Sequence, residues 1–437
     1  MEFDGGRLDR GAADGRLSPP VAKRAARAVH ATPSKASLRG LDWFTFFLAD
    51  IQTGFGPFIA IYLTARHWAQ FDIGLILTVG GLVALAAQMP AGALVDAVRS
   101  SRLVATVAVI AICLSALALA IWPTFPVVMA SRVVHAAASC VLGPVNAALS
   151  LGLVGYAALG ERLGRNARFA SIGNGVAAAA MGACGYFLSV QSLFFLTAAL
   201  VVPAVFALAQ IRPSDVRRQK SERTDGASTS LLDLLSDRRL LVFAGCVLLF
   251  QLANAAMLPL MGSIMTGRSS EWASGLIGAC IVVPQLVVAG CAPWVGRIAD
   301  SWGRRPLLFL CFAALALRGL LFALVADPYV VVVVQALDGV CAAVLGVTMP
   351  LVVADVTRGT GRFNLGLGIV GSAVGIGAAL STSLAGYAFD HFGAAAAFCG
   401  LALIAMLGLA MVWLLLPETR SEIETQSVAL APQPVTI

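Results

Sequence analysis

The sequence carries little charge. Only 12% of its 437 residues are Asp, Glu, Lys or Arg, whereas 59% are hydrophobic and the mean hydropathy is +0.87. A soluble domain of this size has about twice that share of charged residues, so a water-soluble fold is excluded. Uncharged runs of about 20 residues are long enough to cross a bilayer as helices. The composition therefore predicts an all-α membrane protein that crosses the bilayer many times.

Several motifs are also missing. The nine cysteines all lie inside apolar runs, and neither CxxC nor a Cys/His spacing typical of a metal site occurs. The chain has no Ser/His/Asp nucleophile motif, no HExxH and no phosphate loop. These patterns predict that the protein is not an enzyme and holds neither a metal nor a cofactor. The first 40 residues are polar and basic, without the apolar core of a signal peptide.

Twelve apolar runs are present, and each must form a helix because hydrocarbon offers no partner for free backbone groups. The runs span residues 42–64, 74–95, 103–122, 127–150, 168–189, 192–211, 240–264, 273–295, 306–326, 329–353, 366–389 and 395–416.

The basic residues predict the orientation of these helices. With the N-terminus in the cytoplasm, 26 of the 30 Lys and Arg residues fall in cytoplasmic segments, and only Arg66 and Arg268 fall on the opposite side. Cytoplasmic loops are enriched in Lys and Arg, so we expect both termini in the cytoplasm. The net charge of +7 then reports topology and contact with membrane lipid, and we expect no nucleic-acid partner.

The chain divides into two similar halves. Gly92 and Asp96 stand 204 residues before Gly296 and Asp300, and two further matches, in the fourth and tenth runs and the fifth and eleventh, have offsets of 203 and 201. Internal duplication is frequent in transporters. We expect a disordered basic tail (1–40), a six-helix bundle (41–211), a cytoplasmic linker with a short interfacial helix (212–239), a second six-helix bundle (240–417) and a second tail (418–437).

The repeated segment carries a recognisable motif. "GRIADSWGRRP" (296–306) resembles the G-x-x-x-D-x-x-G-R-R loop motif of the major facilitator superfamily, and "PETR" (417–420) resembles a common ending of its last helix. The first copy departs from the motif, since Arg99 replaces the second Gly and Ser100 and Ser101 replace the basic pair. The resemblance implies two pseudo-symmetric six-helix bundles that expose a central site alternately to the two sides. It also implies a cytoplasmic gate formed by Gly92, Asp96, Arg102, Gly296, Asp300, Gly303, Arg304 and Arg305. Alternatively, Arg304 and Arg305 only enforce topology.

Five ionisable groups lie at membrane depth, where charge is costly and is usually paired or functional. Asp50, Arg132, His135 and Asp338 fall on the first, fourth and tenth helices, which by the resemblance line the cavity, and they are candidates for proton coupling. "RVVHAA" (132–137) resembles the R-x-x-Q-G motif that modulates a helix-1 acid in proton-coupled exporters, although His135 and Ala136 replace Gln and Gly. Alternatively, Asp50 is satisfied by the backbone or by Arg132, and His135 is a neutral, hydrogen-bonded side chain. Arg318 and Asp338 are symmetric about residue 328, which predicts an ion pair.

The remaining candidates for the cavity are amides, one hydroxyl, one aromatic ring and one thioether, which suit an organic solute with an apolar body. They are Gln52, Thr53, Phe55, Asn146, Gln251, Asn254, Met257 and Gln335. The alternative is that they form hydrogen bonds between helices.

The expected function is that of a monomeric transporter in the bacterial inner membrane that exports a small organic drug, metabolite or siderophore-like compound in exchange for protons. Exporters of the superfamily usually carry Gly-Pro in the fifth helix, which here reads "SIGNGVAAAAMGACGYF" (171–187). Uptake of a small organic solute therefore remains the main alternative. A transporter-like membrane sensor is the second.

Overall fold

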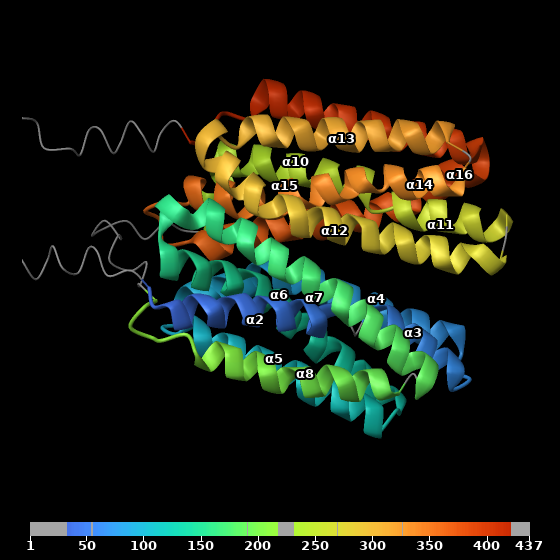
Figure 1. Cartoon of the computed structure of the whole chain (residues 1–437), viewed down its shortest axis with the longest axis horizontal. Helices are drawn as coiled ribbons and strands as arrows, with labels where there is room; N and C mark the ends of the chain where they lie inside the picture. The colour runs from blue at the N-terminus through green and yellow to red at the C-terminus, as the bar shows by residue number, and fades with distance from the viewer. Residues whose placement is uncertain are drawn as a thin grey trace, which may run out of the picture.

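The computed structural model describes residues 33–53, 56–189, 191–216, 231–268, 270–325 and 327–420, which form helices and short connections without a strand (Figure 1). The helices of the first half are α2 (Lys35–Thr53), α3 (Gly56–Ala65), α4 (Gln70–Ala97), α5 (Ser101–Ile121), α6 (Phe125–Val154), the 3-10 turn η1 (Tyr156–Ala158), α7 (Leu159–Phe187) and α8 (Ser192–Ala209). Those of the second half are α9 (Leu231–Ser236), α10 (Arg238–Asn254), α11 (Met257–Arg268), α12 (Ser270–Trp302), α13 (Arg305–Leu324), α14 (Pro328–Val334), α15 (Ala336–Val356) and α16 (Phe363–Leu415).

Nine helical stretches of the described chain are long and apolar enough to cross a membrane. One of them, α16, has 53 residues and supplies two crossings, because Gly393 at φ 85° interrupts its helical backbone. Only glycine adopts such a conformation without strain. With α7 and the pair α2 and α3 the crossings number twelve, as the sequence predicts.

The two halves form two bundles that lie one above the other in Figure 1. Within the first, α2 packs against α7 and α8, and α5 against α6 and α8; within the second, α10 and α13 pack against α16, and α12 against α15. The bundles meet most extensively in two pairs of helices, α4 with α16 and α7 with α12, and α7 also contacts α15. The two bundles therefore meet along two long seams.

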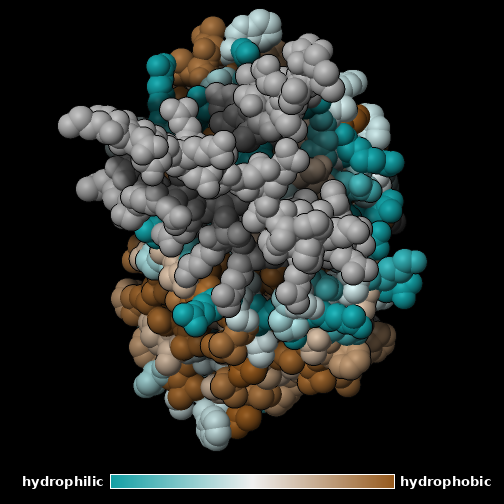
Figure 2. Space-filling model, turned by 90° about the vertical axis from the view of Figure 1, so that its left-hand side faces the viewer, coloured by the Kyte–Doolittle hydropathy of each residue, from teal (hydrophilic) through white to brown (hydrophobic). Residues whose placement is uncertain are grey.

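One end of the molecule carries both ends of the described chain and residues 216 and 231, on the left of Figure 1. We call it the termini end. Figure 2 looks onto this end and shows hydrophilic residues beside the grey atoms and hydrophobic residues along the lower part of the face. Large apolar side chains cover the outside of the helices, as a lipid-facing surface requires; Leu324, for example, is 81% exposed.

Three helix boundaries differ most from the sequence prediction. Helix α2 begins at Lys35 rather than near 42, because the Asp215 carboxylate accepts hydrogen bonds from Ser34 and Ser37 in its first turn. Helix α7 begins at Leu159, nine residues before the expected start, and α12 continues to Trp302, past the expected end at 295. Charged residues at these ends lie inside helices since they find partners in neighbouring helices. The motif residues 296–300 are thus helical and do not form a loop.

Two crossings of the second half are interrupted. Helices α10 and α11 are separated at residues 255–256, and α14 and α15 at Gln335. At the first interruption the backbone N–H of Ala256 donates to the Ser381 hydroxyl at 3.0 Å. Freed backbone groups in a membrane need such partners. The predicted short helix of the linker is present as α9.

Candidate transport site

The first gate joins Asp96, near the end of α4, to the start of α16. Asp96 Oδ1 accepts hydrogen bonds from the backbone N–H of Asn364 (3.1 Å) and from its Nδ2 (2.7 Å), and Oδ2 accepts one from the backbone N–H of Leu365 (2.8 Å). The N–H groups of a first helical turn have no partner inside their helix. A carboxylate satisfies them and gains about 0.3–1 kcal/mol from the helix dipole. Asp96 thereby ties the first bundle to the second.

The second gate repeats this arrangement with the roles of the bundles exchanged. Asp300, near the end of α12, accepts a hydrogen bond from the backbone N–H of Glu161 at the start of α7. The acids of the two gates are 204 residues apart, and their partners Glu161 and Asn364 are 203 residues apart. The duplication therefore relates the two gates as well as the two bundles.

Glycines allow the backbones of the two bundles to come very near each other at both gates. A Cβ on Gly92 would clash with the backbone oxygen of Asn364, and one on Gly296 with the backbone oxygen of Gly160. Deeper along α7, a Cβ on Gly164 would clash with the Ala292 carbonyl. At these positions only glycine lets the backbones of opposite bundles approach.

A cluster behind the second gate, which we call the clasp, consists of Arg304, Asp355, Glu418 and Thr419. Arg304 is 5% exposed. Its Nε donates to Asp355 Oδ2 at 3.0 Å, and Thr419 Oγ1 donates to the same oxygen at 3.0 Å. The Glu418 carboxylate accepts from the backbone N–H groups of Arg304 (2.9 Å) and Arg305 (3.0 Å) and so caps α13. The "PETR" segment therefore holds the second motif copy in place.

Among the described residues, the first motif copy has no such clasp. Ser100 caps α5 with its own hydroxyl, which accepts from the backbone N–H of Leu103 at 3.3 Å. The Arg102 side chain reaches the end of α8, where Nη2 donates to the Ala209 carbonyl at 3.4 Å. The two copies thus share their gates but differ in the side chains behind them.

A cavity of about 360 Å³ lies between the bundles, against α2, α6, α7, α12 and α15. Its polar lining residues are Thr45, Asn146, Asn166, Ser171, Asn174 and Gln285. Ser171 Oγ lies 2.7 Å from both Gln285 Oε1 and the Gln285 carbonyl oxygen, and so joins α7 to α12. The cavity has a size within the range of small-molecule sites, and its described lining carries no charged side chain.

Of these lining residues the sequence analysis singled out Asn146 alone. On α7, Asn166, Ala170 and Asn174 recur every four residues and therefore share a helical face. That signal was available, but the helix was expected to begin at 168 and the cavity to be lined by other helices. The structure adds α7 and α12 to the cavity wall.

A buried chain of polar groups leads from the termini end toward this cavity. Asp42, 2% exposed, pairs with Arg162 Nη2 at 2.8 Å and with Arg165 Nη2 at 2.7 Å. Arg162 Nε donates to Asn166 Oδ1 (2.9 Å), and Asn166 Nδ2 donates to Ser150 Oγ (2.7 Å). These contacts bind α2, α6 and α7 together. Sequence reasoning missed them because it assigned Arg162 and Arg165 to a loop.

A second polar cluster surrounds Arg318, which is 1% exposed in the second bundle. Arg318 Nη1 lies 2.6 Å from Asp338 Oδ1 and 2.5 Å from Asn254 Oδ1, and Nε donates to Gln335 Oε1 at 3.1 Å. Asn254 ends α10 and Gln335 separates α14 from α15, so the guanidinium contacts both helix interruptions. Two predicted cavity residues, Asn254 and Gln335, thus bind this cation.

In the first bundle, Arg132 and His135 lie on α6. Arg132 packs over Gly80 of α4, with its Cγ 2.7 Å from the position of a Cβ there, and its buried Nε has no hydrogen-bond partner among the described residues. His135 is buried, with Nε2 3.3 Å from Ser139 Oγ. Asp50 belongs to α2, but its side chain lies outside the described part, as do the side chains of Thr53 and Phe55.

Three other predicted cavity residues lie elsewhere. Met257 is fully buried and packs on α13, where its Cε is 3.0 Å from the position of a Cβ at Gly319. Gln251 has its Cβ against Gly377 of α16, and Gln52 is exposed. The sequence did not predict that these two residues face other helices, because no polar stripe along α10 and α11 marks which face meets the cavity.

Comparison with known proteins agrees with this architecture. Residues 38–399 match the model of the MFS_1 like family. An uncharacterized MFS-type transporter of Mycobacterium tuberculosis is 38% identical over 399 residues, which are 90% of this chain and 95% of that protein. The class B tetracycline resistance protein of Escherichia coli is 28% identical over 120 residues, 28% of this chain and 29% of its own. The structure of the proton:xylose symporter XylE superposes with a TM-score of 0.69 at 13% identity, over 90% of this chain and 98% of that chain.

Two bundles joined by paired gates around a polar cavity define a multi-pass membrane transporter rather than an enzyme. The chain belongs to the MFS_1-like family of the major facilitator superfamily. Members of this superfamily carry small solutes.

Proposed function

We propose that this protein exports a small organic compound across a bacterial inner membrane in exchange for protons, by exposing the cavity between its bundles alternately to the two sides. The observation that carries the proposal is the position of the cavity behind two closed gates. Both gates lie at the termini end, and the cavity is lined from both bundles. A relative movement of the bundles that opens the gates would open the cavity to that end.

The lining supports the choice of solute. Amide and hydroxyl groups offer hydrogen bonds, while Leu163, Val288 and Pro350 offer apolar contacts. With no charged side chain in the described lining, a solute of low charge with an apolar body is favoured. In this proposal the proton gradient drives the movement and no cofactor takes part. A single chain supplies both bundles, so a monomer is sufficient.

Proton coupling is assigned to acids at membrane depth. Asp338 is 24% exposed and contacts a cation that bridges two interrupted helices, so a change in its protonation would change the contacts of both. Asp50, on α2, is the candidate acid of the first bundle. Removing a charge from a buried pair such as Arg318–Asp338 is costly, so a proton on Asp338 would bias the arrangement of the helices.

Export is favoured over uptake by similarity. The class B tetracycline resistance protein, which is 28% identical to this chain over 120 aligned residues, carries a drug-resistance name. XylE is a symporter, but at 13% identity it shares only the fold. The cytoplasmic position of the termini end rests on the distribution of Lys and Arg.

The experiment uses proteoliposomes with an imposed pH gradient and a panel of lipophilic cations, aromatic antibiotics, siderophores and organic acids. Wild type is compared with Asp50→Asn and Asp338→Asn, and Asp390→Asn, an exposed acid of α16, is the matched control. We expect movement of at least one compound against the proton flux, lost in one of the two test variants and retained in the control. Movement with the proton flux would establish uptake instead. No movement of any compound, with a tail-dependent protein partner, would favour a sensor.

A further inference from the structure

The seam between α7 and α12, which we call the second seam, contains a hydrogen bond from a side chain to a freed backbone carbonyl. Pro293 lies inside α12. Because proline has no N–H, the carbonyl four residues earlier, that of Ala289, loses its helical partner. Arg168 of α7 donates from Nε to this carbonyl at 2.8 Å. A cation of the first bundle therefore completes the backbone of a helix in the second.

This bond lies close to the second gate. At the gate, a Cβ on Gly160 would clash with the Gly296 carbonyl oxygen. Arg168 stands eight residues further along α7, about two helical turns. Pro293 stands three residues before Gly296 on α12, between the gate and the bond. Since proline allows a helix to bend, a change of the bend at Pro293 moves the gate end of α12 relative to α7.

The seam between α4 and α16, which we call the first seam, has the proline without the cation. Pro90 of α4 stands 203 residues before Pro293, so the carbonyl of Ala86 is freed in the same way. The residue 203 positions after Arg168 is Gly371, which has no side chain that could donate. The duplication has thus kept the proline in both seams and the donor in one.

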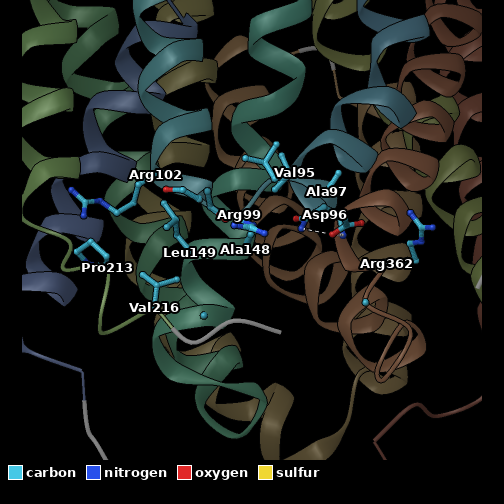
Figure 3. Close-up of a pocket in the computed structure, with 16 residues that line it drawn as sticks. Val95, Asp96, Ala97, Arg99, Arg102, Ala148, Leu149, Pro213, Val216 and Arg362 are labelled. Atoms are coloured by element: carbon cyan, nitrogen blue, oxygen red, sulfur yellow. Dashed lines mark hydrogen bonds between the residues drawn. The ribbon is translucent and has the colours of Figure 1, made fainter. Parts of the chain in front are cut away.

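Open space borders the first seam at the termini end. A cavity of about 530 Å³ lies beside the first gate, lined by the ends of α4 and α6, the start of α5 and the turn before α16. Figure 3 shows Asp96 of the gate at this cavity, with Arg102 and Arg362 to either side. The end of α4, which lies beyond Pro90, therefore has room to change its bend.

We propose that Arg168 is a positioning residue that fixes the bend of α12 while the termini end is closed. The bond joins the two bundles, so it is lost when α7 and α12 move apart. Hydrogen bonds from a charged donor are stronger than those between neutral groups, and this one stabilises the closed arrangement. In the first seam, where Pro90 has no such donor, the bend of α4 is free to change. The inference rests on the alternating movement of the proposed function and holds for any solute and for either direction of transport.

The test uses the full chain in lipid nanodiscs and measures the ratio of closed to open molecules from distances between spin labels across the termini end. Arg168→Met keeps the length of the side chain but removes the donor. We expect the ratio to fall by about fivefold or more, a small effect for a charged donor because Arg168 is exposed. Arg168→Gln places an amide N–H where Nε stands, without the charge, and should restore the ratio to within about threefold of wild type.

A second set of variants tests the link to the proline. Pro293→Ala supplies an N–H to the Ala289 carbonyl from within α12, so Arg168 becomes dispensable. In that background Arg168→Met should change the ratio by less than about twofold. Pro90→Ala, the same substitution in the first seam, is the matched control, and Arg168→Met should have its full effect there.

Three results would overturn the proposal. The first is an unchanged ratio in Arg168→Met, and the second is an equal effect of this variant in the two proline backgrounds. The third is wild-type behaviour of Arg168→Lys together with a full loss in Arg168→Gln, because the charge and not the donor would then matter. The proposed function fails on a different observation, the absence of solute movement in proteoliposomes, so the two failures are distinguishable.

Discussion

The two copies of the motif differ most in what lies behind their gates. In the second half, Arg304 is buried against Asp355, and Glu418 caps the following helix. In the first half, two serines stand in place of the basic pair, and a cavity of about 530 Å³ lies beside the gate. The gate acids and the gate glycines are the same in both. The comparison teaches that the two halves keep the same gate residues while the side chains next to the gates differ.

The largest expected difference between the copies is in stability. Arg304→Gln leaves Asp355 buried without its cation, which should cost about 3–5 kcal/mol. Arg99→Gln removes an exposed charge and should cost less than about 1 kcal/mol. Chemical unfolding in detergent, followed by the fluorescence of the tryptophans, measures both. Equal losses of unfolding free energy in the two variants would contradict the prediction that the clasp stabilises the second motif copy.

The helix caps behind the gates should differ in the same direction. Glu418→Ala removes two hydrogen bonds to a carboxylate at the start of α13, which should cost about 1.5–3 kcal/mol. Ser100→Ala removes a hydroxyl cap from α5 and should cost about 1 kcal/mol. Hydrogen exchange at the first turns of α13 and α5 separates the two effects. Faster exchange in α5 than in α13 would reverse the expected order.

The gates themselves should respond alike. Gly92→Ala and Gly296→Ala each force backbone of the opposite bundle to move, at a cost of about 1–3 kcal/mol against the closed arrangement. The ratio of closed to open molecules should fall by about tenfold or more, as measured by distances between spin labels across the termini end. Gly81→Ala, whose Cβ would meet nothing within 4 Å, is the control. If only one of the two test variants opens the end, the gates are not equivalent.

The smallest effect concerns Asp215, which supports the start of α2. Hydrogen bonds from Ser34 and Ser37 hold the pKa of Asp215 below its usual value. A carboxylate whose pKa is lowered by folding contributes stability above its unfolded pKa, near 4, and loses it as the pH falls through the folded value. Asp215→Asn should therefore cost at most about 1 kcal/mol at pH 7, because solvent screens an exposed carboxylate, and the difference from wild type should shrink below pH 4. A difference that grows at low pH would contradict this assignment.

The bundles also differ at membrane depth. "RVVH" (132–135) in α6 stands 203 residues before "QALD" (335–338), which comprises Gln335 and the first three residues of α15. In the first half this segment carries the cation Arg132 itself; in the second, Gln335 and Asp338 bind a cation supplied by α13. The duplicated positions thus hold polar groups in both halves, but with the charges distributed differently between helices.

Much of the fold could be predicted from the sequence, because hydrocarbon-spanning runs and the distribution of Arg and Lys follow directly from the physics of the bilayer. The ends of the helices could not. Arg162 and Arg165 read as loop residues until Asp42 of another helix is known to neutralise them. A contact between distant segments decides whether such a charge lies inside a helix.

The candidate site was less predictable. The Arg318–Asp338 pair could be inferred because a charge at membrane depth needs a partner and the hairpin places the two at similar depth. Met257 could not be placed, since a helix that is apolar on all sides gives no sign of which face meets a cavity. Nor could the cavity beside the first gate be foreseen, because its wall comes from segments that lie far apart in the sequence.

The position of Glu418 in the chain has a consequence for assembly. The start of α13 emerges during synthesis well before Glu418, which follows the last membrane crossing. Bundles of a long chain form in the order of their synthesis. Helix α13, the ninth crossing, therefore stays uncapped until the second part of α16, the twelfth crossing, has been made. Ser100, in contrast, caps α5, the third crossing, as soon as that helix is made. Biogenesis of the second half ends with a locking step that the first half does not need.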